Sequence, residues 1–148
     1  MSTAILARAG LFLIILWGVS CSQDESSFEL ECQGSEITHT QTERDGELTT
    51  EDSSLEVKRH FTLIQRELNS VMCDQWDERQ IHCLIEDHPK SKSKDVKKSY
   101  VEDFMLNRRE MNVTVNIQKN SQSEHLKIKT TSDFTGGCQS FALRTKSR

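Results

Sequence analysis

The chain has 148 residues, with five cysteines, one proline and a formal net charge of −4. Its first 21 residues differ from the rest, because Arg8 is the only charge before Asp24 and residues 11–17 are an unbroken apolar run. That run is too short to span a bilayer and is typical of a secretory signal peptide. Only 36 apolar residues remain in 22–148. This composition excludes a large enzyme, a repeat protein and a membrane protein, and favours one small secreted domain.

After residues 1–21 are removed, charge divides the mature chain. Residues 22–57 contain eleven acids and one base, whereas residues 58–148 contain 17 bases and 12 acids. Residues 22–52 are also poor in apolar side chains, which predicts a flexible acidic arm. Within it, Phe28, Leu30 and Cys32 alternate with polar residues, so one short strand could form there. Residues 53–148 are expected to form a single small domain.

A helix is predicted to begin at Ser53. The sequence Ser53-Ser54-Leu55-Glu56 fits a capping box. The apolar residues that follow recur at intervals of 4, 3, 4 and 3, as on one face of a helix: Val57, Phe61, Ile64, Leu68 and Val71. The pattern can continue to Pro89. A basic linker follows at residues 88–98, and the spacing of Val96, Tyr100 and Phe104 predicts a second helix over roughly 96–110.

The period then changes from helical to alternating. Val113, Val115 and Ile117 alternate with polar residues, and so do Leu126 and Ile128 after a polar turn at 119–124. This pattern predicts a β-hairpin. We therefore expect a small, disulfide-stapled and mainly α protein with a C-terminal β-hairpin (α+β), with an all-α fold as the alternative. Asn112-Val113-Thr114 is a glycosylation sequon, which secretion would make usable.

Four cysteines remain if Cys21 leaves with the signal peptide: Cys32, Cys73, Cys83 and Cys138. An even number in an oxidising compartment predicts two disulfides, for which three pairings exist. If the first helix is continuous, Cys73 and Cys83 are about 15 Å apart and cannot be joined. A zinc site from Cys73, His82, Cys83 and His88 would have no standard spacing, so we expect no metal or other cofactor.

No catalytic signature occurs in the chain, neither a nucleophile elbow, a metalloprotease motif nor a phosphate-binding glycine loop. We therefore expect a protein that is not an enzyme. The basic linker lacks interleaved aromatic residues, so binding to nucleic acid is not expected. Membrane insertion after removal of the signal is not expected either.

The chain resembles the exocrine gland-secreting peptides, rodent pheromones released in tears and saliva and detected by vomeronasal neurons. The landmarks shared in order are Leu11-Phe12-Leu13-Ile14-Ile15, Thr40-Gln41-Thr42, Gln65-Arg66 followed by Cys73, and Asp133-Phe134-Thr135-Gly136 followed by Cys138 and a basic tail. The resemblance implies a largely helical protein in which Cys73 is joined to Cys138, which leaves Cys32 with Cys83.

The resemblance also implies a function as a secreted signal for the extracellular domain of a type-2 vomeronasal receptor. A stapled helix would then present charges at fixed spacing, and the candidates for receptor contact are Lys58, Arg59, Arg66 and Glu67. The alternative is a secreted helical cytokine-like immune ligand, which suits two helices, two disulfides and one sequon. A carrier is less well supported, because 36 apolar residues can hardly fill a core and also line a large cavity.

Overall fold

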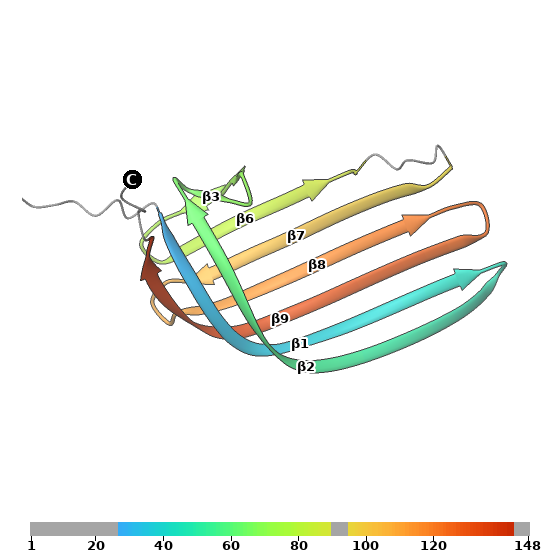
Figure 1. Cartoon of the computed structure of the whole chain (residues 1–148), viewed down its shortest axis with the longest axis horizontal. Coiled ribbons are helices and arrows are strands. Elements are labelled where there is room, and N and C mark those ends of the chain that lie inside the picture. The colour runs from blue at the N-terminus through green and yellow to red at the C-terminus, as the bar shows by residue number, and fades with distance from the viewer. Residues whose placement is uncertain (1–26, 90–94, 144–148) are drawn as a thin grey trace, which may run out of the picture.

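The computed structural model describes residues 27–89 and 95–143, and this part of the chain forms one antiparallel β-sheet without any helix (Figure 1). The nine strands are β1 (Phe28–Arg44), β2 (Glu47–Ile64), β3 (Glu67–Leu68), β4 (Val71–Met72), β5 (Gln75–Trp76), β6 (Gln80–Asp87), β7 (Lys97–Asn107), β8 (Asn112–Gln122) and β9 (Leu126–Ala142). The expectation of a mainly α or all-α protein is therefore wrong. Residues 28–52, expected to be an acidic arm, form β1 and the first part of β2.

The sheet has the strand order β4-β3-β2-β1-β9-β8-β7-β6-β5, so the last strand lies at its centre and the first strand lies beside it. On one side β1 pairs with β2 through a tight turn at Asp45 and Gly46, which both have positive φ. On its other side β1 pairs with β9 from Phe28↔Ala142 to Arg44↔Leu126. Strands β6 to β9 follow one another as a simple meander.

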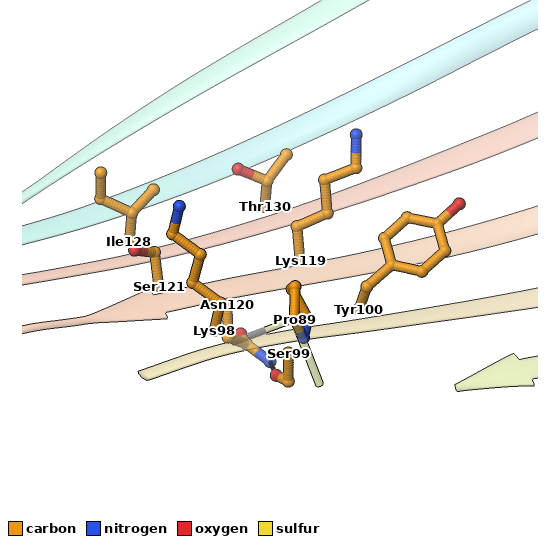
Figure 2. Close-up of a pocket in the computed structure, with 9 residues that line it drawn as sticks. All are labelled: Pro89, Lys98, Ser99, Tyr100, Lys119, Asn120, Ser121, Ile128 and Thr130. Atoms are coloured by element: carbon orange, nitrogen blue, oxygen red, sulfur yellow. Dashed lines mark hydrogen bonds between the residues drawn. The ribbon is translucent and has the colours of Figure 1, made fainter. Parts of the chain in front are cut away.

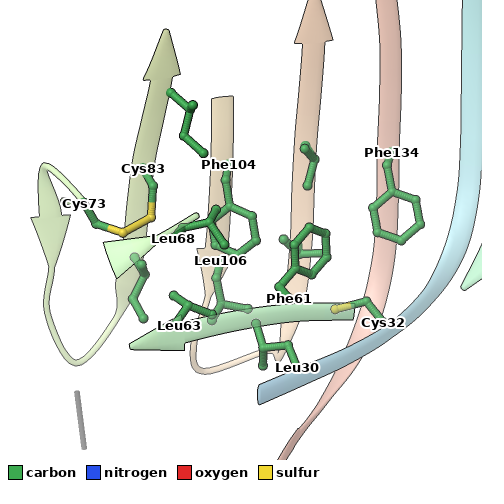
Figure 3. Close-up of a cluster of buried hydrophobic side chains, with 14 of the residues drawn as sticks. Leu30, Cys32, Phe61, Leu63, Leu68, Cys73, Cys83, Phe104, Leu106 and Phe134 are labelled. Atoms are coloured by element: carbon green, nitrogen blue, oxygen red, sulfur yellow. A yellow bond between two sulfur atoms is a disulfide. The ribbon is translucent and has the colours of Figure 1, made fainter. Parts of the chain in front are cut away.

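The sheet curls into a half-barrel that is closed at one end only. There the C-terminal part of β2 crosses in front of β6 and β7 (Figure 1). Phe61 of β2 packs edge-on against Phe104 of β7, with ring centroids 5.0 Å apart. The buried core lies between these layers (Figure 3): Leu30, Cys32, Phe61, Leu63, Leu68, Cys73, Ile81, Cys83, Ile85, Phe104, Leu106, Val113, Val115, Ile117 and Phe134. At the other end no element of the described residues covers the concave face of the sheet.

A glycine pair allows β1 and β9 to approach closely where the sheet curves. Gly34 lies opposite Gly136 in the register. A Cβ atom on Gly34 would come within 2.0 Å of the Thr135 carbonyl oxygen, and one on Gly136 within 2.7 Å of the Gln33 carbonyl oxygen. Neither backbone atom can move aside without breaking the pairing. The position therefore requires glycine in both strands.

The helix predicted from Ser53 is replaced by an edge strand and two tight turns. Inward-facing residues of β2 alternate, with Phe61 and Leu63 buried and Ile64 50% exposed. The chain then reverses at Gln65-Arg66 and again at Asn69-Ser70, four residues that all have positive φ. Two-residue turns between short strands thus bring apolar residues to intervals of three and four, which a helix would also produce.

The prediction of a helix over 96–110 is also wrong, because this segment forms strand β7. Glu102, Phe104 and Leu106 are buried and alternate with Met105, which is 41% exposed. The predicted hairpin is confirmed: β8 pairs with β9, with Val113, Val115 and Ile117 buried. Its second strand, β9, continues past Ile128 to Ala142 and pairs with β1 along its whole length on its other edge.

All four cysteines of the described residues form disulfides, but the pairing that the resemblance implied is wrong. Cys32 is joined to Cys138 across the β1–β9 pair. Cys73 is joined to Cys83, as Figure 3 shows. The geometric exclusion of Cys73–Cys83 assumed a continuous helix. Instead, Cys73 follows β4 and lies against β6, which contains Cys83. The first disulfide joins the two ends of the domain, with a sequence separation of 106, and the second clips the small strands over the core.

Replacing Gly34 with alanine tests the close approach of β1 and β9. The added methyl would overlap backbone atoms, so we expect Gly34→Ala to lower the free energy of unfolding by more than about 2 kcal/mol. Gly137→Ala is the matched control, because a Cβ there meets no atom within 4 Å; it should change stability by less than about 0.5 kcal/mol. Urea denaturation of both variants measures this, and equal effects would contradict the register.

Peptide mapping without reduction tests the pairing of the cysteines. After proteolysis of the purified protein, mass spectrometry should find the Cys32 peptide linked to the Cys138 peptide. Cys73 and Cys83 should be linked to each other. A Cys73–Cys138 link would contradict the described sheet, because it would separate Cys138 from its register partner on β1.

Candidate functional site

The four residues predicted to contact a receptor do not form one surface. Lys58 and Arg59 are neighbours on β2 and point to opposite faces of the sheet: Lys58 pairs with Glu31, and Arg59 pairs with Glu36. Arg66 lies in the turn after β2, and Glu67 begins β3. Of the four, only Arg59 belongs to a network on the concave face.

The concave face changes from apolar to polar along the strands, row by row across the sheet. The register places Phe104, Val115 and Phe134 side by side in the core. The next row toward the open end contains Glu102, Ile117 and Ser132, all buried. The two rows beyond it are Tyr100, Lys119 and Thr130, then Lys98, Ser121 and Ile128. The polar groups of the last two rows are therefore accessible from the open end.

Arg59 and Glu36 form an ion pair at the boundary between the core and the polar rows. Nη2 of Arg59 donates to Oε1 of Glu36 at 2.5 Å, and the hydroxyl of Ser132 donates to the same oxygen. The guanidinium also lies 5.4 Å from the ring centroid of Phe134. The hydrogen bond from Arg59 lowers the pKa of Glu36, and the hydrogen bond from Ser132 lowers it by a smaller amount. Burial has the opposite effect and raises this pKa.

Tyr100 and Glu102 form a second polar pair, from neighbouring inward positions of β7. The Tyr100 hydroxyl donates to Oε2 of Glu102 at 2.5 Å, and Glu102 is only 6% exposed. Desolvation, together with this carboxylate, raises the pKa of Tyr100. Nζ of Lys119 lies 5.8 Å from the centroid of the tyrosine ring. Tyr100 therefore connects a buried carboxylate to an exposed ammonium group.

A hollow of about 240 Å³ lies beside this pair on the open half of the concave face (Figure 2). Its lining comes from β7, β8 and β9 and from the segment after β6: Pro89, Lys98, Ser99, Tyr100, Lys119, Asn120, Ser121, Ile128 and Thr130. Sequence reasoning did not single out any of them as a site. The alternation along β8 and β9 was visible, but their partner β7 was predicted to be a helix.

The outer edge of β2 is a second exposed feature. Within the described residues, β2 pairs with β3 only at Leu63 and Ile64, so Glu47–Thr62 has a strand partner on the β1 side alone. Both faces of its first ten residues are exposed. Leu48 and Leu55 are 64% and 63% exposed on this segment. An edge of this length leaves a row of backbone donors and acceptors open to another chain.

His82 of β6 joins two carboxylates outside the core. Its Nδ1 lies 2.6 Å from Oδ2 of Asp74, and its Nε2 lies 2.7 Å from Oδ1 of Asp103. The hydrogen bond with Asp74, followed by that with Asp103, raises the pKa of His82. Because the native pKa is raised, this contribution to stability is present at acidic pH and is lost as the pH rises through the native pKa. The arrangement fastens the strand pair β6–β7 to the chain between β4 and β5.

Asn112, the predicted glycosylation site, is exposed at the start of β8 and donates to Glu110. It lies at the closed end, opposite Asn107 of β7. A glycan there would leave the concave hollow and the first half of β2 uncovered.

Among residues 27–89 and 95–143 no group of three or more histidine, cysteine or acidic side chains could hold a metal ion. Nor does any helix in this part of the chain have the length and apolar character needed to cross a membrane. The predicted signal peptide, residues 1–21, lies outside the described residues. Two disulfides are consistent with an extracellular protein.

No protein-family model matches the chain, and comparison with curated proteins and with solved structures likewise gives no match. The resemblance to exocrine gland-secreting peptides implied a helical fold and a Cys73–Cys138 link, and the structure has neither. The all-β fold does not fit a helical cytokine either. The functional argument therefore depends on the geometry of this chain.

Replacing Glu36 with glutamine tests the ion pair on the concave face. The pKa of Glu36 is lower in the native state than its unfolded value of 4.5. Glu36 therefore stabilises the fold at pH values above 4.5, and this contribution is lost as the pH falls through the native pKa. Glu36→Gln should therefore cost about 1 kcal/mol at pH 7 and less at pH 3. Urea denaturation at both values measures it, with the exposed Glu51→Gln of β2 as control. A cost independent of pH would contradict the ion pair.

Proposed function

We propose that this protein is a secreted, non-catalytic ligand that binds the extracellular part of a cell-surface receptor through the open edge of β2. The observation that carries the proposal is the absence of a strand partner along Glu47–Thr62 in the described sheet. Proteins commonly blunt or cover such edges, because an exposed edge adds strands from other chains. A receptor segment in extended conformation can pair there by main-chain hydrogen bonds.

The register tells which backbone groups of β2 face outward. Arg44 and Glu47 flank a two-residue turn, so they exchange hydrogen bonds with each other, and the pattern alternates from there. The N–H and C=O groups of Leu48, Thr50, Asp52 and Ser54 therefore point away from β1. They are the groups to which a partner strand would bind.

Charge favours a basic partner over a second copy of this chain. The segment 43–56 contains six carboxylates and one guanidinium. Antiparallel pairing of two such edges would bring like charges together across the interface, which is unfavourable. A receptor strand with lysine or arginine would gain from the same charges, and its association would be accelerated by electrostatic attraction. Leu48 and Leu55, exposed on opposite faces, provide apolar contacts on either side of that strand.

The type of receptor is a prediction from the resemblance alone. Vomeronasal type-2 receptors have a large extracellular domain, which could supply the strand that pairs with β2. The predicted signal peptide and the two disulfides support release of the protein outside the cell. Of the four charges predicted to contact the receptor, Arg59 is occupied by its ion pair with Glu36, and the other three lie outside the concave network.

Replacing Ser54 with proline tests the edge. The substitution removes an outward N–H and leaves the bonds to β1 intact, and proline is tolerated on edge strands. Calcium imaging of dissociated vomeronasal neurons should show a response to the purified protein. Ser54→Pro should need at least ten times more protein for the same response, whereas Ser54→Ala should match the wild type.

Each result of this experiment has a separate meaning. If no neuron responds, the predicted receptor type is wrong. If Ser54→Pro is as potent as the wild type, the edge of β2 is not the binding element. Circular dichroism and the unfolding midpoint of Ser54→Pro must match those of Ser54→Ala, which excludes misfolding as the cause of a loss.

A further inference from the structure

We propose that the hollow on the open half of the concave face binds a small amphiphilic anion, a carboxylate attached to a short apolar body. This site is separate from the edge of β2 and does not depend on the proposed receptor. The register places its lining in two adjacent rows across three strands: Tyr100, Lys119 and Thr130, then Lys98, Ser121 and Ile128.

Among the described residues, the lining has two ammonium groups and no carboxylate. Lys98 and Lys119 both border the hollow, and none of the described lining residues is acidic (Figure 2). Two carboxylates of the concave face are already bound, Glu102 by the Tyr100 hydroxyl and Glu36 by Arg59. Glu51 lies in the row of Lys119, two strands beyond Thr130, and does not line the hollow. Asp87 lies next to Tyr100 in the register but does not line the hollow. The local excess of positive charge therefore favours an anion.

The rest of the lining suits an apolar body with few polar groups. The ring of Tyr100 and the side chains of Ile128 and Pro89 provide carbon surface, while the hydroxyls of Ser121 and Thr130 can donate to a carboxylate. Figure 2 shows Lys119, Thr130 and Ile128 side by side above the sheet. A few placed polar groups on a mostly apolar surface are typical of ligand sites.

The volume limits the size of the ligand. A hollow of about 240 Å³ lies below the range of about 300–1,000 Å³ that is usual for sites of drug-sized molecules. A medium-chain fatty acid or an aromatic carboxylate would fill it, whereas a long-chain lipid would extend into solvent. The closed end offers no room for such a chain, because the row of Glu102, Ile117 and Ser132 below it is buried.

Titration of the full-length secreted protein with octanoate tests the site. Amide NMR shifts locate the bound ligand, and calorimetry measures its affinity. Octanoate should shift the amides of Tyr100, Lys119, Ser121 and Thr130, and octanamide, its neutral analogue, should bind at least ten times more weakly. Lys119→Met should weaken octanoate binding at least tenfold. The matched control is Lys129→Met. Lys129 lies on β9, the strand next to that of Lys119, and its side chain is exposed on the opposite face of the sheet.

Three outcomes would overturn the proposal: equal affinity for octanoate and octanamide, equal effects of Lys119→Met and Lys129→Met, or amide shifts confined to residues away from the hollow. Ser54→Pro should bind octanoate as the wild type does. Octanoate binding by Ser54→Pro distinguishes failure of the hollow from failure of the proposed receptor edge, because the hollow and the edge of β2 have no residue in common.

Discussion

The pairing of β1 with β9 is the constraint on which the rest of the structure depends. It joins the N-terminal hairpin β1–β2 to the C-terminal meander β6–β9 over the whole length of both strands. Without it the chain would divide into two sheets, each with exposed apolar residues. The Cys32–Cys138 disulfide fixes this pair across a sequence separation of 106, a loop long enough for the cross-link to remove much entropy from the unfolded chain. A chain with few apolar residues gains the most from such a cross-link.

The same pair of strands determines how the sheet curls. At Gly34 and Gly136 the backbones lie too close for any side chain, and β2 is carried with β1 over the face of β6 and β7. Phe61 and Leu63 thereby reach Phe104 and close one end. Beyond that point β1 and β2 diverge from β6 and β7, and the concave face remains open. The bend of β1 and β9 at Gly34 and Gly136 therefore produces both the core and the uncovered concave surface.

The sequence allowed part of this fold to be predicted, where the pattern is local. The alternation of Val113, Val115 and Ile117 identified β8, and that of Phe28, Leu30 and Cys32 indicated the start of β1. The turn at Asp45-Gly46 was overlooked, because residues 22–52 were expected to form a flexible arm, although this dipeptide is typical of two-residue hairpin turns. The prediction for the end of β2 was wrong. Val57, Phe61 and Ile64 lie on one strand, and the intervals of four and three that follow, to Leu68 and Val71, span turns at non-glycine residues with positive φ.

The candidate sites were harder to predict than the strands, because each depends on partners distant in sequence. Arg59 was singled out as one of a row of charges on a helix, whereas its role follows from Glu36 and Phe134 on two other strands. Lys119 and Tyr100 become neighbours only through the β7–β8 register. A strand places alternate residues on one face, but which residues share a site depends on pairing that propensity does not encode.

The shortage of apolar residues explains why the two ends of the half-barrel differ. The fifteen buried apolar residues of the described chain are enough to fill the space between β2 and the β6–β7 pair, and they are concentrated there. Toward the open end the inward positions are occupied by Thr38, Tyr100, Lys119 and Thr130, which water can solvate. Extending the strands beyond the core adds little to stability, since both faces of β2 are exposed there. What these extensions provide is surface: an unpaired backbone edge on one side and a positively charged hollow on the other.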